Sequence, residues 1–227
     1  EDAIPDNVEP FVQAVIGEGV AASPNSELGW VGSLSQLFLG DGYWIKIDPD
    51  ITSLELIWNS DNNRTTISEH DIIKNPIHFK FTQSTLQSFY FIESIKTETF
   101  SIDKDDILIA TCNDIIVGSR YYIGKYTDVP AMGEDGENTS GYCLESDSPR
   151  FKLFDSETGR IIELYSENKI PKWRNLEIFN INLSDKSNIS QPSTADISSV
   201  YPNPFNPSTT ISYTLDNQEM INLSIFD

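Results

Sequence analysis

The sequence contains few of the residues that most often perform catalysis. It has only two histidines, His70 and His78, and neither belongs to a G-x-S-x-G or H-E-x-x-H motif. A zinc site built from the histidines and cysteines would need four ligands at recognisable spacings, and these spacings are absent. We therefore expect a non-enzymatic protein. A carboxylate pair for glycoside hydrolysis stays an alternative, because the distance between two carboxylates depends on the fold.

Positive charge is also scarce. Fifteen lysines and arginines stand against 35 aspartates and glutamates, which gives a formal net charge of −20. Such a surface repels nucleic acids and anionic lipids, so we expect neither as a partner. No apolar run approaches the roughly 20 residues that a membrane-spanning helix needs, so we expect no membrane span. The composition instead suits solubility outside the cell and weak binding of cations.

The most distinctive segment begins at Val200. It reads Val-Tyr-Pro-Asn-Pro-Phe-Asn-Pro-Ser-Thr-Thr-Ile-Ser-Tyr over residues 200–213. Its three prolines fix their own φ angles and favour extended conformations in the residues before them. Apolar and polar residues then alternate over 209–215 and again over 221–226, which predicts two strands joined by a turn at 216–217. An ordinary edge hairpin is the alternative reading of this pattern.

These residues resemble the opening of the type A C-terminal sorting domain, which addresses proteins to the type IX secretion system of Bacteroidetes-like bacteria. The resemblance implies the secretion machinery as a partner and the cell surface or medium of a Gram-negative bacterium as the destination. A complete domain of this type is a small β-sandwich that would continue beyond Asp227, because two strands cannot bury a core alone. Glu1 follows neither a methionine nor a signal peptide, so we expect an internal fragment of a longer precursor.

The sequence has two cysteines, Cys112 and Cys143, and the predicted export of the protein determines the redox environment in which they lie. In the oxidising environment that the sorting resemblance implies, we expect them to form a disulfide. A loop of this length would contribute roughly 3–4 kcal/mol through the entropy of the unfolded chain. Two buried free thiols are the alternative.

Residues 1–58 are expected to form a small β-rich module. Ala14-Val15-Ile16 predicts a strand that ends at a glycine. The segments 17–22, 29–34 and 40–47 resemble a module that recurs in large secreted proteins of marine and thermophilic bacteria, with the typical form IxGEGxAA, WxGSL and GYWxKV; no function is assigned to it. Its glycines suit turns with positive φ. A dinucleotide-binding motif is excluded because the third glycine is missing and no helix is expected.

Residues 77–183 read almost entirely as strands. Alternation of apolar residues predicts a strand at 77–81, and short apolar runs predict strands at 89–92, 107–109 and 115–117. The runs at 151–154 and 161–164 flank a glycine-containing segment and predict a hairpin.

The same region resembles a repeated extracellular module of these bacteria, with matches at 114–120, 128–136, 141–142 and 151–155. Ile116 stands where that module usually has cysteine, whereas Cys112 lies four residues earlier.

We thus expect an all-β protein: a β-sandwich, Ig-like or jelly-roll-like, over 59–183, preceded by the smaller module at 1–58. A linker at 184–199 is rich in serine, aspartate and asparagine and lacks apolar periodicity. The start of the sorting domain follows at 200–227.

The best candidate for a metal site is the acidic, glycine-containing loop at 128–137. Asp128, Glu134, Asp135 and Glu137 would supply the oxygen ligands that Ca²⁺ prefers, although the loop does not match the EF-hand pattern. A solvated acidic loop is the alternative. A weaker acidic cluster at 103–106 is expected to be a plain turn.

Aromatic residues are the other candidates for ligand binding. Trp58, Tyr121, Tyr122 and Trp173 could present rings on which sugars stack, whereas core packing is the alternative for each of them. The leading expectation is a non-enzymatic binding, adhesion or structural module of a larger secreted or surface-anchored protein. An accessory carbohydrate-binding region of a secreted polysaccharide hydrolase or peptidase is the second; surface polysaccharides or other surface proteins are the expected partners.

Overall fold

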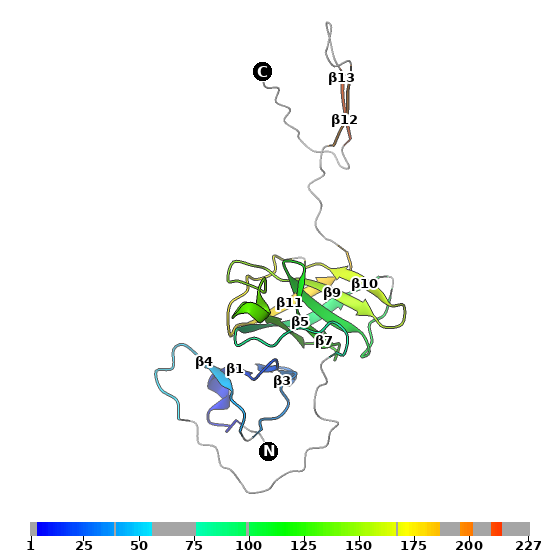
Figure 1. The fold of residues 1–227 in the computed structure, drawn as a ribbon. Helices are drawn as coiled ribbons and strands as arrows, with labels where there is room; N and C mark the ends of the chain where they lie inside the picture. The colour runs from blue at the N-terminus through cyan, green and yellow to red at the C-terminus, as the bar shows by residue number, and fades with distance from the viewer. Residues whose placement is uncertain are drawn as a thin grey trace. The chain divides into compact units, whose positions relative to one another are not determined.

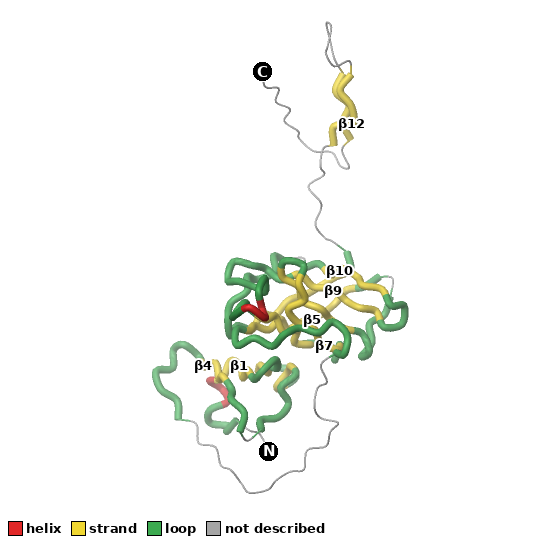
Figure 2. The backbone as a smooth tube through the Cα atoms, viewed as in Figure 1, coloured by secondary structure: helices red, strands yellow, loops and turns green. Residues whose placement is uncertain are grey.

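The computed structural model describes residues 4–38, 40–55, 76–98, 100–166 and 168–186, together with the backbone of 196–201 and 210–214. These residues form an all-β protein, which confirms the expected fold class (Figure 2). Within the described ranges the only helices are two short 3₁₀ turns, η1 (Glu9–Phe11) and η2 (Glu137–Thr139). The chain divides into two compact units, Glu1–Lys186 and Ser187–Asp227.

The first unit contains three sheets (Figure 1). The N-terminal sheet has the strand order β3-β2-β1-β4 and consists of β1 (Val12–Ile16), β2 (Ala21–Asn25), β3 (Gly29–Gly32) and β4 (Trp44–Ile47). The central sheet has the order β11-β5-β8 and consists of β5 (Gln87–Lys96), β8 (Thr127–Met132) and β11 (Ile178–Ser184). The outer sheet has the order β10-β9-β6-β7 and consists of β6 (Ile107–Cys112), β7 (Ile115–Tyr121), β9 (Arg150–Asp155) and β10 (Arg160–Leu164).

Strand β5 shows why the three sheets stack. Side chains of successive strand residues point to opposite faces of a sheet. Tyr90 and Ile92 belong to the main core, which the central sheet shares with the outer sheet. Phe89 and Phe91 belong to a second core, which the central sheet shares with Ile16 and other residues of the N-terminal sheet. The first six residues of β5 are therefore buried on both faces, and exposed residues alternate only from position 93 onward.

The main core lies between the central and the outer sheet and holds the sandwich together. Leu108 and Leu153 from the outer sheet are fully buried in it, and the rings of Tyr90 and Phe151 lie 5.2 Å apart between the two sheets. Tilted ring pairs at this distance add to the stabilisation that comes from burying apolar area. The N-terminal sheet adds a third layer, and its opposite face has a small core of its own around Val12 and Val15.

Most of the expected strands are confirmed. The runs at 89–92, 107–109 and 115–117 lie in β5, β6 and β7, and the hairpin pairs β9 with β10 around Gly159 at a φ of 69°.

The strand expected at 77–81 is wrong. Phe79 has a φ of 61°, which an extended strand does not allow, and Ile77 is 74% exposed. Phe79 instead packs its ring 5.1 Å from that of Phe154. Alternation alone predicted a strand, but the segment has no partner strand in the described structure.

The second unit contains one hairpin within its described residues. Strand β12 (Asp196–Tyr201) pairs antiparallel with β13 (Thr210–Thr214), and Val200 lies opposite Ile211. The first predicted strand of the tail is thereby confirmed. The expected linker at 184–199 is too long at both ends, because β11 includes Ser184 and β12 begins at Asp196. The second predicted tail strand, at 221–226, lies outside the described residues.

Candidate functional site

The two cysteines form a disulfide, as expected. Cys112 ends strand β6, Cys143 follows η2, and their Cα atoms lie 5.4 Å apart. The bond joins the outer sheet to a segment that also pairs with the end of β8 through an isolated bridge between Gly133 and Cys143. It therefore holds the 133–143 loop against the sandwich.

Asp128 is not on a loop, and this part of the calcium expectation is wrong. It lies within β8, its side chain is fully buried, and it pairs with Arg120 of β7. Burial raises the pKa of the Asp128 carboxyl, while the charge of Arg120 and the hydroxyl of Ser33 oppose that rise. Its neighbours Val129 and Ala131 belong to the main core, so the strand cannot turn Asp128 outward without exposing them.

The other three acidic residues do lie in the predicted loop, but each has a separate position. Asp135 accepts hydrogen bonds from the backbone N–H and the hydroxyl of Thr85 (2.7 and 2.9 Å) and from the hydroxyl of Thr139 (2.7 Å). The Thr85 N–H is the main reason that the pKa of Asp135 lies well below its ordinary value. Glu134 accepts the N–H of Gly141 at 2.7 Å, and Glu137 begins η2.

The carboxylates of Glu134 and Asp135 therefore stabilise the loop through hydrogen bonds. In the described part of the chain, no group of three or more histidine, cysteine, aspartate or glutamate side chains is arranged to hold a metal ion. Calcium binding by Glu134, Asp135 and Glu137 stays a prediction. The cluster at 103–106 is the expected turn, in which Asp106 accepts the N–H of Asp103 at 3.0 Å.

The predicted aromatic residues that the structure describes do not form a common surface. Trp173 is a core residue, only 3% exposed, and its indole N–H donates to the carbonyl of Ala131 at 2.8 Å, so its assignment as a ligand-binding ring is wrong. Tyr122 packs against the main core, and Tyr121 is half-buried at the end of β7. Trp58 lies outside the described residues.

A buried polar network joins the N-terminal sheet to the sandwich. Ser33, which follows β3, donates to Asp128 at 2.5 Å. Arg120 donates to the backbone carbonyls of Asp128 (3.0 Å) and Gly19 (2.6 Å). The side chain of Gln87 accepts the N–H of Gly19 at 3.0 Å and donates to the carbonyl of Gly17 at 2.9 Å. The 17–22 and 29–34 motifs thus attach the N-terminal sheet to β5, β7 and β8.

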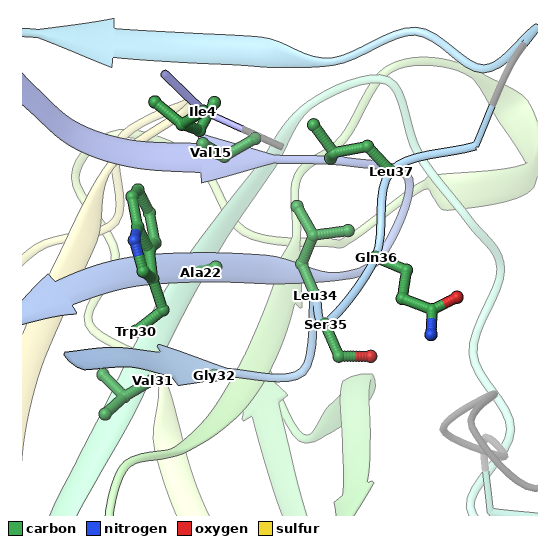
Figure 3. Close-up of a pocket in the computed structure, with 10 residues that line it drawn as sticks. All are labelled: Ile4, Val15, Ala22, Trp30, Val31, Gly32, Leu34, Ser35, Gln36 and Leu37. Atoms are coloured by element: carbon green, nitrogen blue, oxygen red, sulfur yellow. The ribbon is translucent and has the colours of Figure 1, made fainter. Parts of the chain in front are cut away.

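The opposite face of the N-terminal sheet carries a pocket of about 320 Å³ (Figure 3). Val15, Ala22 and Gly32 lie side by side across β1, β2 and β3 and form its floor. Because two of these three residues have little or no side chain, the floor leaves a hollow. The walls carry larger apolar side chains, namely those of Ile4, Trp30, Leu34 and Leu37.

The residues of the Trp-Val-Gly-Ser-Leu motif serve both faces of the sheet. Trp30 and Leu34 line the pocket, Val31 packs against the second core and also borders the pocket, and Ser33 bonds to Asp128. Gly32 has a φ of 112°, and a Cβ there would lie 2.3 Å from the carbonyl oxygen of Ala21, so only glycine fits. The sequence pattern marked this motif but gave no sign of the pocket.

A second, polar hollow of about 250 Å³ lies beside the disulfide, between the β6–β7 turn and the start of β9. Arg150 and Asp114 form an ion pair of 3.6 Å at this hollow, and both side chains are largely exposed. Such an exposed pair contributes little binding energy of its own.

No family model matches the chain, and no match was found among curated proteins or solved structures. Among the described residues there is no helix of the length and hydrophobicity needed to cross a membrane. Any assignment of function therefore depends on the sequence resemblances and on the geometry given above.

Proposed function

We propose that residues 1–186 are a non-enzymatic binding, adhesion or structural module of a larger secreted or surface-anchored bacterial protein, and that residues 200–227 begin a type IX sorting domain. The observation that carries the proposal is the separation of the chain into two units at Ser187, just before the segment with the sorting-domain resemblance. A sorting segment must reach its machinery without unfolding its cargo. Separation between two compact units meets that requirement.

The disulfide supports the proposed destination. Disulfides form and persist in oxidising compartments, which include the periplasm and the cell surface. A chain with a net charge of −20 is also well suited to remain soluble there.

The role of the carboxylates supports a non-enzymatic module. Acid–base catalysis needs a carboxylate that is within reach of a substrate and able to exchange a proton. Asp128 is fully buried against Arg120, Asp135 is held by Thr85 and Thr139, and Asp155 accepts hydrogen bonds from residues 157 and 158 of its own turn. Each of these groups stabilises the fold.

Export in a host with a type IX system tests the proposal. In the intact protein, residues 200–227 are replaced by a glycine–serine segment of the same length, and the protein is quantified in the periplasm, on the surface and in the medium. We expect the variant to accumulate in the periplasm. A matched control replaces residues 187–195 in the same way and should be exported normally. Equal export of both variants would contradict the addressing role.

A further inference from the structure

We propose that the pocket over Ala22 is a docking site for an apolar side chain carried on a basic polypeptide segment. The inference names a partner for the binding role proposed above and rests on that role.

The lining of the pocket selects an apolar group. The side chains around the hollow are those of Ile4, Val15, Ala22, Trp30, Leu34 and Leu37. Figure 3 shows Trp30, Leu34 and Leu37 on the same side of the N-terminal sheet, with the polar ends of Ser35 and Gln36 extending away from them. Ser35 and Gln36 also belong to the lining, but most of the lining side chains are apolar. A volume of about 320 Å³ would hold on the order of ten waters, and those beside the apolar side chains have no hydrogen-bond partner there. An apolar side chain would displace that water favourably.

The only polar atom of the Trp30 side chain already has a hydrogen-bond partner. The indole N–H donates to the Glu9 carboxylate at 2.5 Å. This bond fixes the ring at the edge of the pocket and leaves its carbon atoms as the contact surface. A ligand that depended on an indole hydrogen bond would have to displace Glu9, whereas an aliphatic or aromatic group would not.

The charge of the N-terminal module selects a basic carrier. Between positions 4 and 55 the sequence has eight carboxylates and one basic side chain, whereas positions 76–186 have eighteen and twelve. The eight carboxylates are those of Asp6, Glu9, Glu18, Glu27, Asp41, Asp48, Asp50 and Glu55. The one basic side chain, Lys46, pairs with Glu177 of the sandwich. The N-terminal module thus attracts cationic chains more strongly than the rest of its unit does.

The pocket lies on the face of the N-terminal sheet that carries the small core around Val12 and Val15. The other face of the sheet is occupied by the second core and by the buried network of Arg120 and Asp128. The pocket lies on the face of the N-terminal sheet that points away from this attachment. Binding in the pocket therefore does not compete with attachment to the sandwich.

Peptide binding by the full chain tests the proposal. Fluorescence anisotropy is measured with a labelled peptide Lys-Lys-Leu-Lys-Lys and with two controls, Lys-Lys-Ser-Lys-Lys and Glu-Glu-Leu-Glu-Glu. We expect the first to bind at least about tenfold more tightly than either control, which corresponds to about 1.4 kcal/mol. Equal binding of the leucine and serine peptides would overturn the role of the pocket, and equal binding of the acidic peptide or of N-acetyl-leucinamide would overturn the role of charge.

Variants locate the site. Ala22→Leu fills the hollow from its floor and should weaken binding about tenfold. Leu37→Asn, on the segment after β3, should weaken binding by a similar factor. With two independent pocket variants, the role of the pocket can still be tested if one of them fails to fold. Asp6→Asn with Glu27→Gln should weaken binding and reduce its salt dependence, whereas Asp105→Asn with Glu157→Gln, on the sandwich, should not. Unchanged binding by both pocket variants would place the peptide elsewhere.

Two further readouts identify the occupant of the pocket and separate docking from export. A concentration-dependent dimer that both pocket variants abolish would identify a second copy as the occupant and overturn the assignment to a basic segment. Export of the Ala22→Leu variant should be normal. Failure of peptide binding with normal export would therefore reject the docking site and leave the proposed destination standing.

Discussion

Replacing Arg120 should destabilise the first unit far more than replacing an arginine on its surface. In Arg120→Leu, the Asp128 carboxylate would remain buried without its cation. Removing one partner of a buried pair typically costs about 3–5 kcal/mol, because the remaining charge has neither water nor counter-charge. The carbonyl of Gly19 would also lose its donor at 2.6 Å. We expect a loss of about 3–5 kcal/mol in the free energy of unfolding.

Arg150→Leu is the matched control. Arg150 also lies in the outer sheet and also pairs with an aspartate, Asp114, but the side chains of this pair are 75% and 84% exposed. Exposed pairs contribute about 0–1 kcal/mol. The same substitution in the same sheet therefore separates the effect of burial from that of losing an arginine.

Urea unfolding followed by tryptophan fluorescence measures both variants. All four tryptophans lie within the first 186 residues, so the signal reports the first unit. A difference of less than about 1 kcal/mol between the two variants would refute the reasoning, since it would mean that the Arg120 pair is no more buried in solution than the Arg150 pair.

The pH dependence distinguishes a charge effect from a packing effect. Burial already raises the folded-state pKa of Asp128, and without Arg120 only the Ser33 hydroxyl and backbone hydrogen bonds would oppose that rise, so this pKa would lie still further above the unfolded value. The folded state would then bind the extra proton, so the deficit of Arg120→Leu should shrink as the pH falls through that raised pKa. Adding Asp128→Asn should recover part of the stability at pH 7 and remove this pH dependence. A deficit that neither acid nor Asp128→Asn reduces would be a packing defect.

Four other outcomes are expected. Reducing the disulfide, or replacing both cysteines in Cys112→Ser with Cys143→Ser, should lower the free energy of unfolding by about 4 kcal/mol because it opens a loop of 31 residues. A loss below about 1 kcal/mol in urea unfolding would contradict this. Gly118→Ala places a Cβ 1.6 Å from the carbonyl oxygen of Pro130 and should cost about 1–3 kcal/mol, whereas Gly42→Ala, with open space around it, should change little. The pKa of Asp135 is lowered in the folded protein, so its contribution is present above the unfolded pKa and is lost on acidification; Asp135→Asn should be less stable at pH 7 and show less loss of stability in acid. Deleting residues 187–227 should leave the unfolding midpoint of the first unit unchanged, because they form a separate unit; a lowered midpoint would show that the tail contributes to the sandwich.

The strands of the sandwich were predictable because the pattern of apolar and polar side chains along each strand follows which of its faces are buried. The run Phe89–Ile92 is apolar on both faces, as expected of a strand buried between two layers. The segment at 77–81 shows where periodicity fails. Its alternation matches a strand, but its aromatic residues pack on the sandwich from a chain that turns at Phe79. Periodicity records which residues are buried and does not record whether a partner strand is present.

The buried polar residues were harder to predict because their types usually occur on surfaces. Arginine and aspartate are rarely fully buried unless they are paired, so the residue types of Arg120 and Asp128 do not distinguish them from solvated residues. The apolar residues Val129, Ala131 and Met132 gave the one available signal that Asp128 lies in a buried strand. The glycine beside Glu134 and Asp135 suggested a flexible metal loop, whereas their carboxylates accept backbone and hydroxyl hydrogen bonds instead.

The two faces of the N-terminal sheet explain why the motif Trp-Val-Gly-Ser-Leu alternates in size and polarity. Val31 and Ser33 face the sandwich, where close approach of β3 requires glycine at 32 and where Ser33 bonds to the buried carboxylate of Asp128. Trp30 and Leu34 contribute nothing to that attachment, and yet they are the largest side chains of the motif. Attachment alone would be served equally well by small or polar residues at these two positions. Trp30 and Leu34 instead pack against the small core around Val12 and Val15 and also line the pocket, so the same face both stabilises the module and carries the binding site that we propose.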